Sequence, residues 1–360
     1  MGSFQESKTI SISRSAYKLW LKKMQTNTHT MKGTDNLKVT SKIMTLKQAI
    51  NQYVINGCHL SIGGFTINRN PMAAVYEIIR QEIKGIHLYA HSNGQGVDEL
   101  VGAGCISCLE IAYGGSGKFA STCIRFKKAV QEKKIKIEDY SNYQMSLRFL
   151  AGSMGIAFLP TRSSLGTDII KKWGFSSEFR LQNSRLPDQK LIEMDNPFGD
   201  WCDTKKVVLV PAINPDVTII HVQKADVKGN CRIDGLPFVD VEQAKAAENL
   251  IITCEELIND DSLKNTPERN QIPFNHASAV IHIPHGAYPT ACYNYYDYDS
   301  IFLNEYAQKA SNDKLYHSYI KDSILNHPTH KKLLNFVGKE RLAMIAADKH
   351  YGYAKNLDRG

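Results

Sequence analysis

Apolar and polar positions follow two periods along this chain, and the period changes at short intervals. Residues 45–56 have apolar side chains at helical spacing, and Gly57 ends that pattern. Residues 58–63 then form a short apolar run that is typical of a buried strand, and a second helical pattern covers residues 71–81. The first part of the chain therefore predicts helices that alternate with buried strands.

The same change of period recurs through most of the sequence. Later strands are expected at residues 86–91, 107–113, 207–210, 217–223, 250–253 and 280–283, and later helices at residues 97–102, 120–132 and 143–154. Strands separated by such helices form right-handed crossover units. We therefore predict an α/β fold, an open and mainly parallel sheet with helices on both faces. Residues 162–203 lack a clear period and are expected to run irregularly over the surface.

Three loops that follow predicted strands are short, polar and rich in glycine. Residues 63–66 read Gly-Gly-Phe-Thr, residues 92–96 read Ser-Asn-Gly-Gln-Gly, and residues 114–117 read Gly-Gly-Ser-Gly. In a parallel sheet such loops gather at the carboxyl edge, where ligands bind. Tight turns also favour glycine for structural reasons alone, so ordinary connections stay an alternative. The candidate substrate-binding residues are Gly63, Gly64, Phe65, Asn93, Gly94, Gln95, Gly115 and Ser116.

The net charge of +8 is concentrated at the start of the chain. Residues 1–43 hold eight basic and two acidic residues, so the remainder carries only +2 and shows no basic stripe interleaved with aromatics. A nucleic-acid partner is therefore not expected. The Ser- and Thr-rich composition of residues 1–43 predicts a disordered extension that folding does not require, with an organelle presequence as the alternative. We expect the α/β domain at residues 44–345 and a C-terminal tail at residues 346–360.

The sequence has no run of 18 apolar residues and no secretory signal, so we expect a cytoplasmic protein that does not bind membranes, or one of an organelle matrix if residues 1–43 are a presequence. The eight cysteines are scattered, which favours reduced thiols over a disulfide framework. Cys105 and Cys108 lack a second pair, and His221, His282 and His285 lack a metal-binding spacing. We therefore expect no metal and no permanently bound cofactor.

Several segments together point to one family. They are residues 63–71 (GGFTINRNP), 98–104 (DELVGAG), 195–198 (DNPF), 253–256 (TCEE) and 286–299 (GAYPTACYNYYDYD). With them the chain resembles the A (alpha) subunit of family I coenzyme A transferases, most closely the glutaconate CoA-transferase type. The resemblance covers residues 44–345 and implies the CoA-transferase-like fold of the NagB/RpiA-like superfamily.

The resemblance also implies how the enzyme works. It implies a heterodimer or heterotetramer with a B subunit that supplies the nucleophilic glutamate, so no catalytic residue is expected on this chain. An acyl-CoA thioester and a small carboxylic acid, with dicarboxylic acids among the candidates, would be the substrates. The turn at residues 63–65 would polarise the acyl oxygen, and Asn93, Gln95 and Ser116 would hydrogen-bond the acid.

Three points stay open in the sequence. A second carboxylate on the acid would need a cation, for which Arg69, Lys118 and Arg125 are candidates. A CoA-thioester hydrolase or ring-cleaving enzyme of the same family is one alternative function, although Gln144 lies near the position of that enzyme's glutamate and is not a carboxylate. The other alternative is a non-catalytic acyl-CoA-binding protein.

Overall fold

The computed structural model describes residues 41–259 and 263–355. Its strands are β1 (His59–Ile62), β2 (Ile86–Asn93), β3 (Ile106–Gly114), β4 (Lys136–Asp139), β5 (Phe158–Thr161), β6 (Ile192–Asp195), β7 (Lys206–Pro211), β8 (Val217–Ala225), β9 (Cys231–Arg232), β10 (Asn249–Leu257) and β11 (Ala277–His282). Its α-helices are α2 (Leu46–Tyr53), α3 (Met72–Arg80), α4 (Gln95–Gly102), α5 (Ile124–Gln131), α6 (Asn142–Ser153), α7 (Ser177–Leu181), α8 (Asp240–Ala246), α10 (Ser300–Ala310), α11 (Asp313–Tyr319), α12 (His330–Val337) and α13 (Lys339–Ile345).

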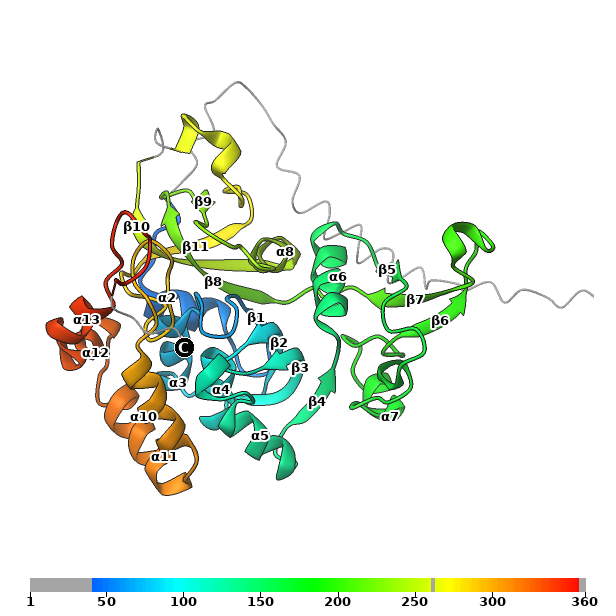
Figure 1. The fold of residues 1–360 in the computed structure, drawn as a ribbon, viewed down its shortest axis with the longest axis horizontal. Helices are drawn as coiled ribbons and strands as arrows, with labels where there is room; N and C mark the ends of the chain where they lie inside the picture. The colour runs from blue at the N-terminus through cyan, green and yellow to red at the C-terminus, as the bar shows by residue number, and fades with distance from the viewer. Residues whose placement is uncertain (1–40, 260–262, 356–360) are drawn as a thin grey trace, which may run out of the picture. The chain divides into compact units, whose positions relative to one another are not determined.

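The main sheet has the strand order β11-β10-β8-β1-β2-β3-β4, with the short β9 paired to β8 (Figure 1). Every pairing along that path is parallel, and only β9 runs antiparallel. The α/β fold with a mainly parallel sheet is thereby confirmed. Because β1 lies at the centre, between β8 and β2, the loop that follows it occupies the middle of the carboxyl edge.

Helices cover both faces of this sheet, as expected, because successive strand residues point to opposite sides. Ile219 and Ile251 pack with α2, α3 and α4 in the largest apolar cluster. Their neighbours Ile220 and Ile252 pack in a second cluster, together with α8. The helix α6 covers β2 and β3 on the side of that second cluster and contacts α8. All eight cysteines are free thiols, and only Cys202 is exposed.

Residues 162–203 depart from our expectation of irregular surface excursions. They include α7 and β6, and β6 joins β5 and β7 in a separate antiparallel sheet with the order β5-β7-β6. Several of their side chains are buried, among them Phe175, Arg180 and Lys190. Arg180 and Lys190 form ion pairs with the buried carboxylate of Glu138, which ties this segment to β4. The segment is thus a folded part of the domain.

At both ends of the expected domain, residues that we placed outside it form hydrogen bonds with residues inside it. Residues 41–43, which we expected in the N-terminal extension, include Lys42, whose backbone N–H donates to Val227 O at 2.8 Å and whose carbonyl accepts from Val280 N at 2.9 Å. Residues 346–355, which we expected in the C-terminal tail, include Ala354, whose N–H donates to Asp297 at 3.0 Å. Residues 1–40 and 356–360 lie outside the described residues. None of the helices within the described ranges is long and apolar enough to cross a membrane.

One buried carboxyl group lies in α4 without a cationic partner. Glu99 is fully buried and accepts hydrogen bonds from Gln95 Nε2, at 2.9 Å, and from the hydroxyl of Tyr319. Its other oxygen has no hydrogen-bond partner. Burial raises the pKa of Glu99 from about 4.5 to about 8, more than these hydrogen bonds lower it. The folded chain therefore holds a proton on Glu99 at neutral pH.

This proton makes stability depend on pH in a direction that can be tested. Between pH 4.5 and 8 the folded chain keeps a proton that the unfolded chain releases, so Glu99 costs stability as pH rises. Glu99→Gln, which is neutral at every pH, should remove that loss. Its free energy of unfolding, measured by urea denaturation at several pH values, should fall less steeply than that of the wild type, by up to about 1.4 kcal/mol per pH unit. Parallel pH profiles for the two proteins would contradict the assignment.

Candidate functional site

The three glycine-rich loops meet at the carboxyl edge of β1, β2 and β3. The N–H of Thr66 donates to Ser92 O at 2.8 Å, and the N–H of Gly94 donates back to Thr66 O at 3.1 Å. A side chain at Gly94 would come within 2.5 Å of Gly115 O and 2.8 Å of Ser116 Oγ. Glycine is needed at this position because all three loops close around it. The structure therefore brings the predicted site residues into one region.

The three backbone N–H groups of the turn at residues 63–65 all donate to acceptors within the protein. The N–H of Gly63 donates to Ile219 O and that of Phe65 to Asn68 O, while the N–H of Gly64 donates to the Asp240 carboxylate at 2.9 Å. Gly64 has φ +87°, and a Cβ there would meet Asn68 O at 2.6 Å, so the turn itself requires glycine. An acyl oxygen could reach one of these N–H groups only in exchange for its present acceptor. The role of the turn in polarising that oxygen stays a prediction.

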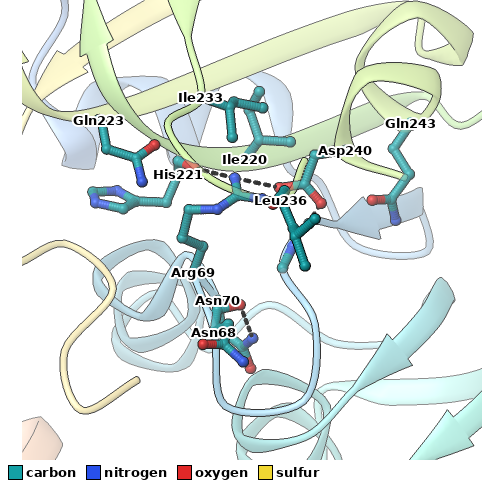
Figure 2. Close-up of polar contacts among 12 residues, drawn as sticks. Asn68, Arg69, Asn70, Ile220, His221, Gln223, Ile233, Leu236, Asp240 and Gln243 are labelled. Carbon is teal, nitrogen blue, oxygen red and sulfur yellow. Dashed lines mark hydrogen bonds and ion pairs between the residues drawn. The ribbon is translucent and has the colours of Figure 1, made fainter. Parts of the chain in front are cut away.

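A buried ion pair fixes the far end of this turn. Arg69 donates to Asp240 at 2.9 Å, and Figure 2 shows its guanidinium between Asp240 and the backbone of His221. Neither side chain is more than 3% exposed. Burial raises the pKa of Asp240, and the neighbouring Arg69 opposes that shift. The pair joins the loop after β1 to the start of α8 and to β8.

The three side chains predicted to bind the acid differ in what they contact. Asn93 donates to Gly63 O at 3.0 Å and accepts from Val97 N at 3.1 Å. Gln95 is turned toward Glu99, to which it donates. Ser116 is 5% exposed, and its hydroxyl lies 3.9 Å from Cys123 Sγ. The side chains of Asn93 and Gln95 are therefore engaged in positioning the loops. The hydroxyl of Ser116, in contrast, makes no strong hydrogen bond to the described residues.

A cleft of about 490 Å³ opens beside the turn. Its lining comes from the loop after β1, the β9–α8 connection and the C-terminal part of the chain, namely Phe65, Thr66, Asn68, Arg69, Asp234, Gly235, Leu236, Phe238, Ala291, Tyr293, Tyr296, Asp297 and Tyr353. The rings of Phe65 and Phe238 stack at 4.6 Å. Thr66, Arg69 and Phe238 have positive φ, a backbone conformation that often marks functional sites.

The cleft residues outside the loop after β1 could not be recognised from the sequence. Phe238 and Asp240 stand in a segment without a recognised motif, and no short-range pattern connects them to residues about 170 positions earlier. Tyr293 and Tyr296 belong to the tyrosine-rich stretch 286–299, which carries the family resemblance but gives no sign of a cleft by itself.

A buried carboxylate holds the segment that carries Tyr293 and Tyr296. Glu255 accepts from His221 Nε2 at 2.7 Å, from the Tyr296 hydroxyl at 2.5 Å and from the backbone N–H of His285 at 2.7 Å. Burial favours the protonated form, but these hydrogen bonds outweigh it and hold the pKa of Glu255 below its ordinary value.

The same group includes a set of potential metal ligands that does not fit a metal well. Donor atoms of His221, Glu255 and Cys292 lie within 4.8 Å of one another. However, both ring nitrogens of His221 are engaged, by Glu255 and by Thr253 Oγ1 at 2.9 Å. Burial raises the pKa of the Cys292 thiol well above its ordinary value, which disfavours the thiolate that binds metals. The cluster is better described as a hydrogen-bonded support for the cleft.

The three cations considered for a second substrate carboxylate lie in different environments. Arg69 is paired with Asp240. Arg125 donates to Asp313 at 2.8 Å and lies over the ring of Tyr316. Lys118 is exposed, with its Nζ 5.9 Å from the ring of Phe119. Arg69 and Arg125 therefore each already have an acidic partner.

The chain matches a known family over most of its length. Residues 43–282 match the coenzyme A transferase family model. The chain is 37% identical over 313 residues to the A subunit of glutaconate CoA-transferase from Acidaminococcus fermentans, covering 87% of this chain and 97% of the relative. It is 31% identical to the A subunit of 3-oxoadipate CoA-transferase from Pseudomonas knackmussii, covering 79% and 94% of the two chains.

Two further comparisons bear on fold and function. The crystal structure of glutaconate coenzyme A-transferase from Acidaminococcus fermentans superposes with a TM-score of 0.84 and 36% identity, covering 88% of this chain and 99% of that chain. A cholesterol ring-cleaving hydrolase IpdA subunit of Rhodococcus jostii is 24% identical, covering 78% and 90%. The two transferase relatives are thus more similar to this chain than the hydrolase relative.

We expect the Arg69–Asp240 pair to control the stability of the cleft. Asp240→Asn would leave the buried guanidinium without a carboxylate, which costs about 3–5 kcal/mol. Arg69→Met together with Asp240→Leu should be less destabilising than Asp240→Asn alone, because no unpaired charge remains. Thermal unfolding of these variants beside the wild type checks this order.

The matched control is Asp168→Asn. Asp168 forms an ion pair with Lys172 in which both side chains are more than 70% exposed, so its loss should change stability by less than about 1 kcal/mol. If Asp240→Asn unfolds at the same temperature as this control, the buried pair does not hold the turn.

Proposed function

This chain belongs to the coenzyme A transferase family, and from that membership we propose that it is the A subunit of a heteromeric CoA-transferase. The enzyme moves CoA from an acyl-CoA donor to a carboxylic acid acceptor. The observation that carries the proposal is the 37% identity to the A subunit of a CoA-transferase over 97% of that relative's length. We further propose that this chain and a B subunit form a heterodimer or heterotetramer, in the cytoplasm or an organelle matrix.

The reaction requires a nucleophile that we place on the partner subunit. A glutamate carboxylate attacks the carbonyl carbon of the thioester, the C–S bond breaks, and CoA leaves as its thiolate. The thiolate then attacks the glutamyl carbonyl carbon of the resulting anhydride, which releases the donor acid and leaves CoA on the enzyme as a thioester. The acceptor acid takes over the CoA by the same two steps in reverse. CoA thus enters as a substrate and not as a permanently bound cofactor.

The carboxyl groups around the three loops support this division between subunits. A carboxylate nucleophile must be ionised and must reach the thioester carbon. Glu99 is buried and protonated at neutral pH. Asp240 is paired with Arg69, and the buried Asp98 accepts from Phe126 N at 2.7 Å and from the Tyr306 hydroxyl at 2.8 Å. Each of these groups is protonated or held by other partners, so we place the nucleophile on another chain.

In this proposal the A subunit contributes a preorganised wall. The aromatic side chains of the cleft, above all Phe65 and Phe238, give the acyl group an apolar surface next to the loop junction. Ser116 lies at that junction with a hydroxyl able to donate to a substrate carboxylate. A rigid wall spares the complex the entropy of ordering these groups when substrate binds.

Reconstitution tests the proposal directly. The purified chain alone should show no CoA transfer between an acyl-CoA and isotopically labelled free acids, because it lacks the nucleophile. The complex with its cognate B subunit should show transfer. Robust turnover by the homogeneous chain alone would overturn the assignment, and thioester hydrolysis by the complex at an equal rate without acceptor acid would support the hydrolase alternative.

Two substitutions test the placement of the site within the complex. Phe65→Ala removes part of the cleft wall, and Ser116→Ala removes only a hydroxyl. Each should raise the KM for the acid or lower kcat/KM by about 5- to 30-fold, since one lost hydrogen bond or ring contact is worth about 1–2 kcal/mol. Gly64→Val would be less informative, because a Cβ there collides with the turn's own backbone. Normal kinetics in both assembled variants would mean that these loops are connections only.

A further inference from the structure

The three-stranded sheet β5-β7-β6 has one face made entirely of apolar side chains. Residues that pair directly across antiparallel strands lie on the same face. Leu209 of β7 pairs with Pro160 of β5 and with Ile192 of β6. Continuing the register gives the full set on this side, which we name the outer face: Phe158, Pro160, Ile192, Met194, Val207, Leu209 and Pro211.

The opposite face of the same sheet packs on the rest of the domain. Val208 and Val210 point to that side and are fully buried in a cluster with Phe149 of α6. None of the seven outer-face residues is buried, and Phe158, Ile192 and Met194 are 49%, 42% and 40% exposed. A sheet normally places polar residues on its solvent side. The outer face lacks polar residues, so it has the composition of a protein interior. Among the described residues, however, no layer of side chains covers it.

More exposed aromatic side chains border the outer face. Phe198 and Trp201, in the connection from β6 to β7, are 80% and 70% exposed, and Tyr143 at the start of α6 is 58% exposed. With Pro160 and Val207 these three line a depression of about 630 Å³. Aromatic side chains that stand in solvent beside a depression are typical of the centre of protein interfaces.

The size of this region suits a protein partner. Three strands about 4.8 Å apart and four to six residues long present roughly 200–300 Å². The bordering aromatic residues extend it to the scale of the largest apolar patches that monomers expose, which is about 300–600 Å². A stable interface buries about 800 Å² on each partner. The outer face can therefore supply the apolar centre of such an interface, with polar surroundings making up the rest.

This surface is continuous with the candidate active site. Tyr143 follows Asn142, whose side chain accepts from Ser92 Oγ at 2.6 Å and whose carbonyl contacts His91 Nε2 at 3.0 Å. The ring of His91 lies 6.0 Å from that of Phe65, which lines the cleft. A chain that covers the outer face and Tyr143 therefore also reaches the edge where the three loops meet.

We propose that the outer face is the docking surface for the nucleophile-bearing B subunit, an inference that rests on the proposed function. A second copy of this chain would bring the same carboxyl groups at its loops, Asp98, Glu99 and Asp240, which are protonated or already engaged. The subunit that borders the loop junction must be the one that supplies the missing glutamate. Because the seven outer-face residues carry no charge, the matching surface on the partner should be apolar.

The test introduces charge on the outer face and measures association. The double variant Ile192→Glu and Met194→Glu places two carboxylates where the partner would exclude water. With purified cognate B subunit, we expect a rise in Kd of about 100-fold or more, as for central interface residues. Both side chains are at least 40% exposed, so the variant alone should keep the circular dichroism spectrum and thermal midpoint of the wild type.

The control is Phe336→Glu, which introduces a carboxylate at an exposed apolar position that is not part of the outer face. Phe336 is 65% exposed on α12, and Figure 1 shows α12 on the opposite side of the main sheet from β6. The Kd of this variant for the B subunit should equal that of the wild type.

The outcomes separate this inference from the proposed function. If the folded double variant binds the B subunit with the wild-type Kd, the outer face is not the docking surface, although the proposed function stands. If the double variant instead disrupts only self-association of this chain, the occupant is a second copy and the inference is overturned. If the wild-type chain does not associate with the cognate B subunit, the proposed function itself fails.

Discussion

The Arg69–Asp240 ion pair is the interaction on which the geometry of the carboxyl edge depends. It lies between two fully or nearly buried side chains, and it connects residues 171 positions apart. The same carboxylate accepts the N–H of Gly64, and the same guanidinium donates to backbone carbonyls of His221 and Leu236. One pair thus sets the turn after β1, the position of α8 and the lip of the cleft (Figure 2). A buried charge pair is a weak source of net stability but a strong constraint on geometry, because either partner alone would be an unpaired charge.

The same principle recurs on the face of the sheet that α6 covers, where buried carboxylates link elements that are distant in sequence. Glu110 of β3 contacts His87 at 2.8 Å and accepts from Arg148 of α6 at 2.6 Å, while Glu138 of β4 is paired with Arg180 and Lys190. Each carboxylate is nearly or fully buried and satisfied by cations. Such networks are costly to disturb, since a single loss leaves the remaining charge in a low dielectric. They make the chain a rigid support, which is the property that the wall of a shared active site requires.

The spacing of apolar residues predicted the structure well where each helix or strand has one buried face or is fully buried. The change from helical to strand period located β1, β2, β3 and β8, and the glycine-rich loops after the first three strands indicated one edge of the sheet correctly. The individual roles were harder to infer. Asn93 and Gln95 look like ligand-binding residues in sequence, but Asn93 donates to Gly63 of a neighbouring loop, and Gln95 donates to Glu99 one turn later in the same helix. The partner of Arg69 could not be inferred either, because Asp240 stands in no recognisable motif.

The segment 162–203 escaped sequence-based prediction because its regular elements are short: α7 has five residues and β6 has four. A half-buried strand is recognised by alternation of apolar and polar residues. β6 alternates apolar and polar residues, but only over four positions, and its apolar residues Ile192 and Met194 occupy the side that solvent would normally take. Its partner β7, expected as a strand at residues 207–210, is apolar on both sides, because Val208 and Val210 face the domain while Val207 and Leu209 face outward. A strand whose solvent side is apolar in a single chain has the pattern expected of a strand that is buried on both sides in an assembly.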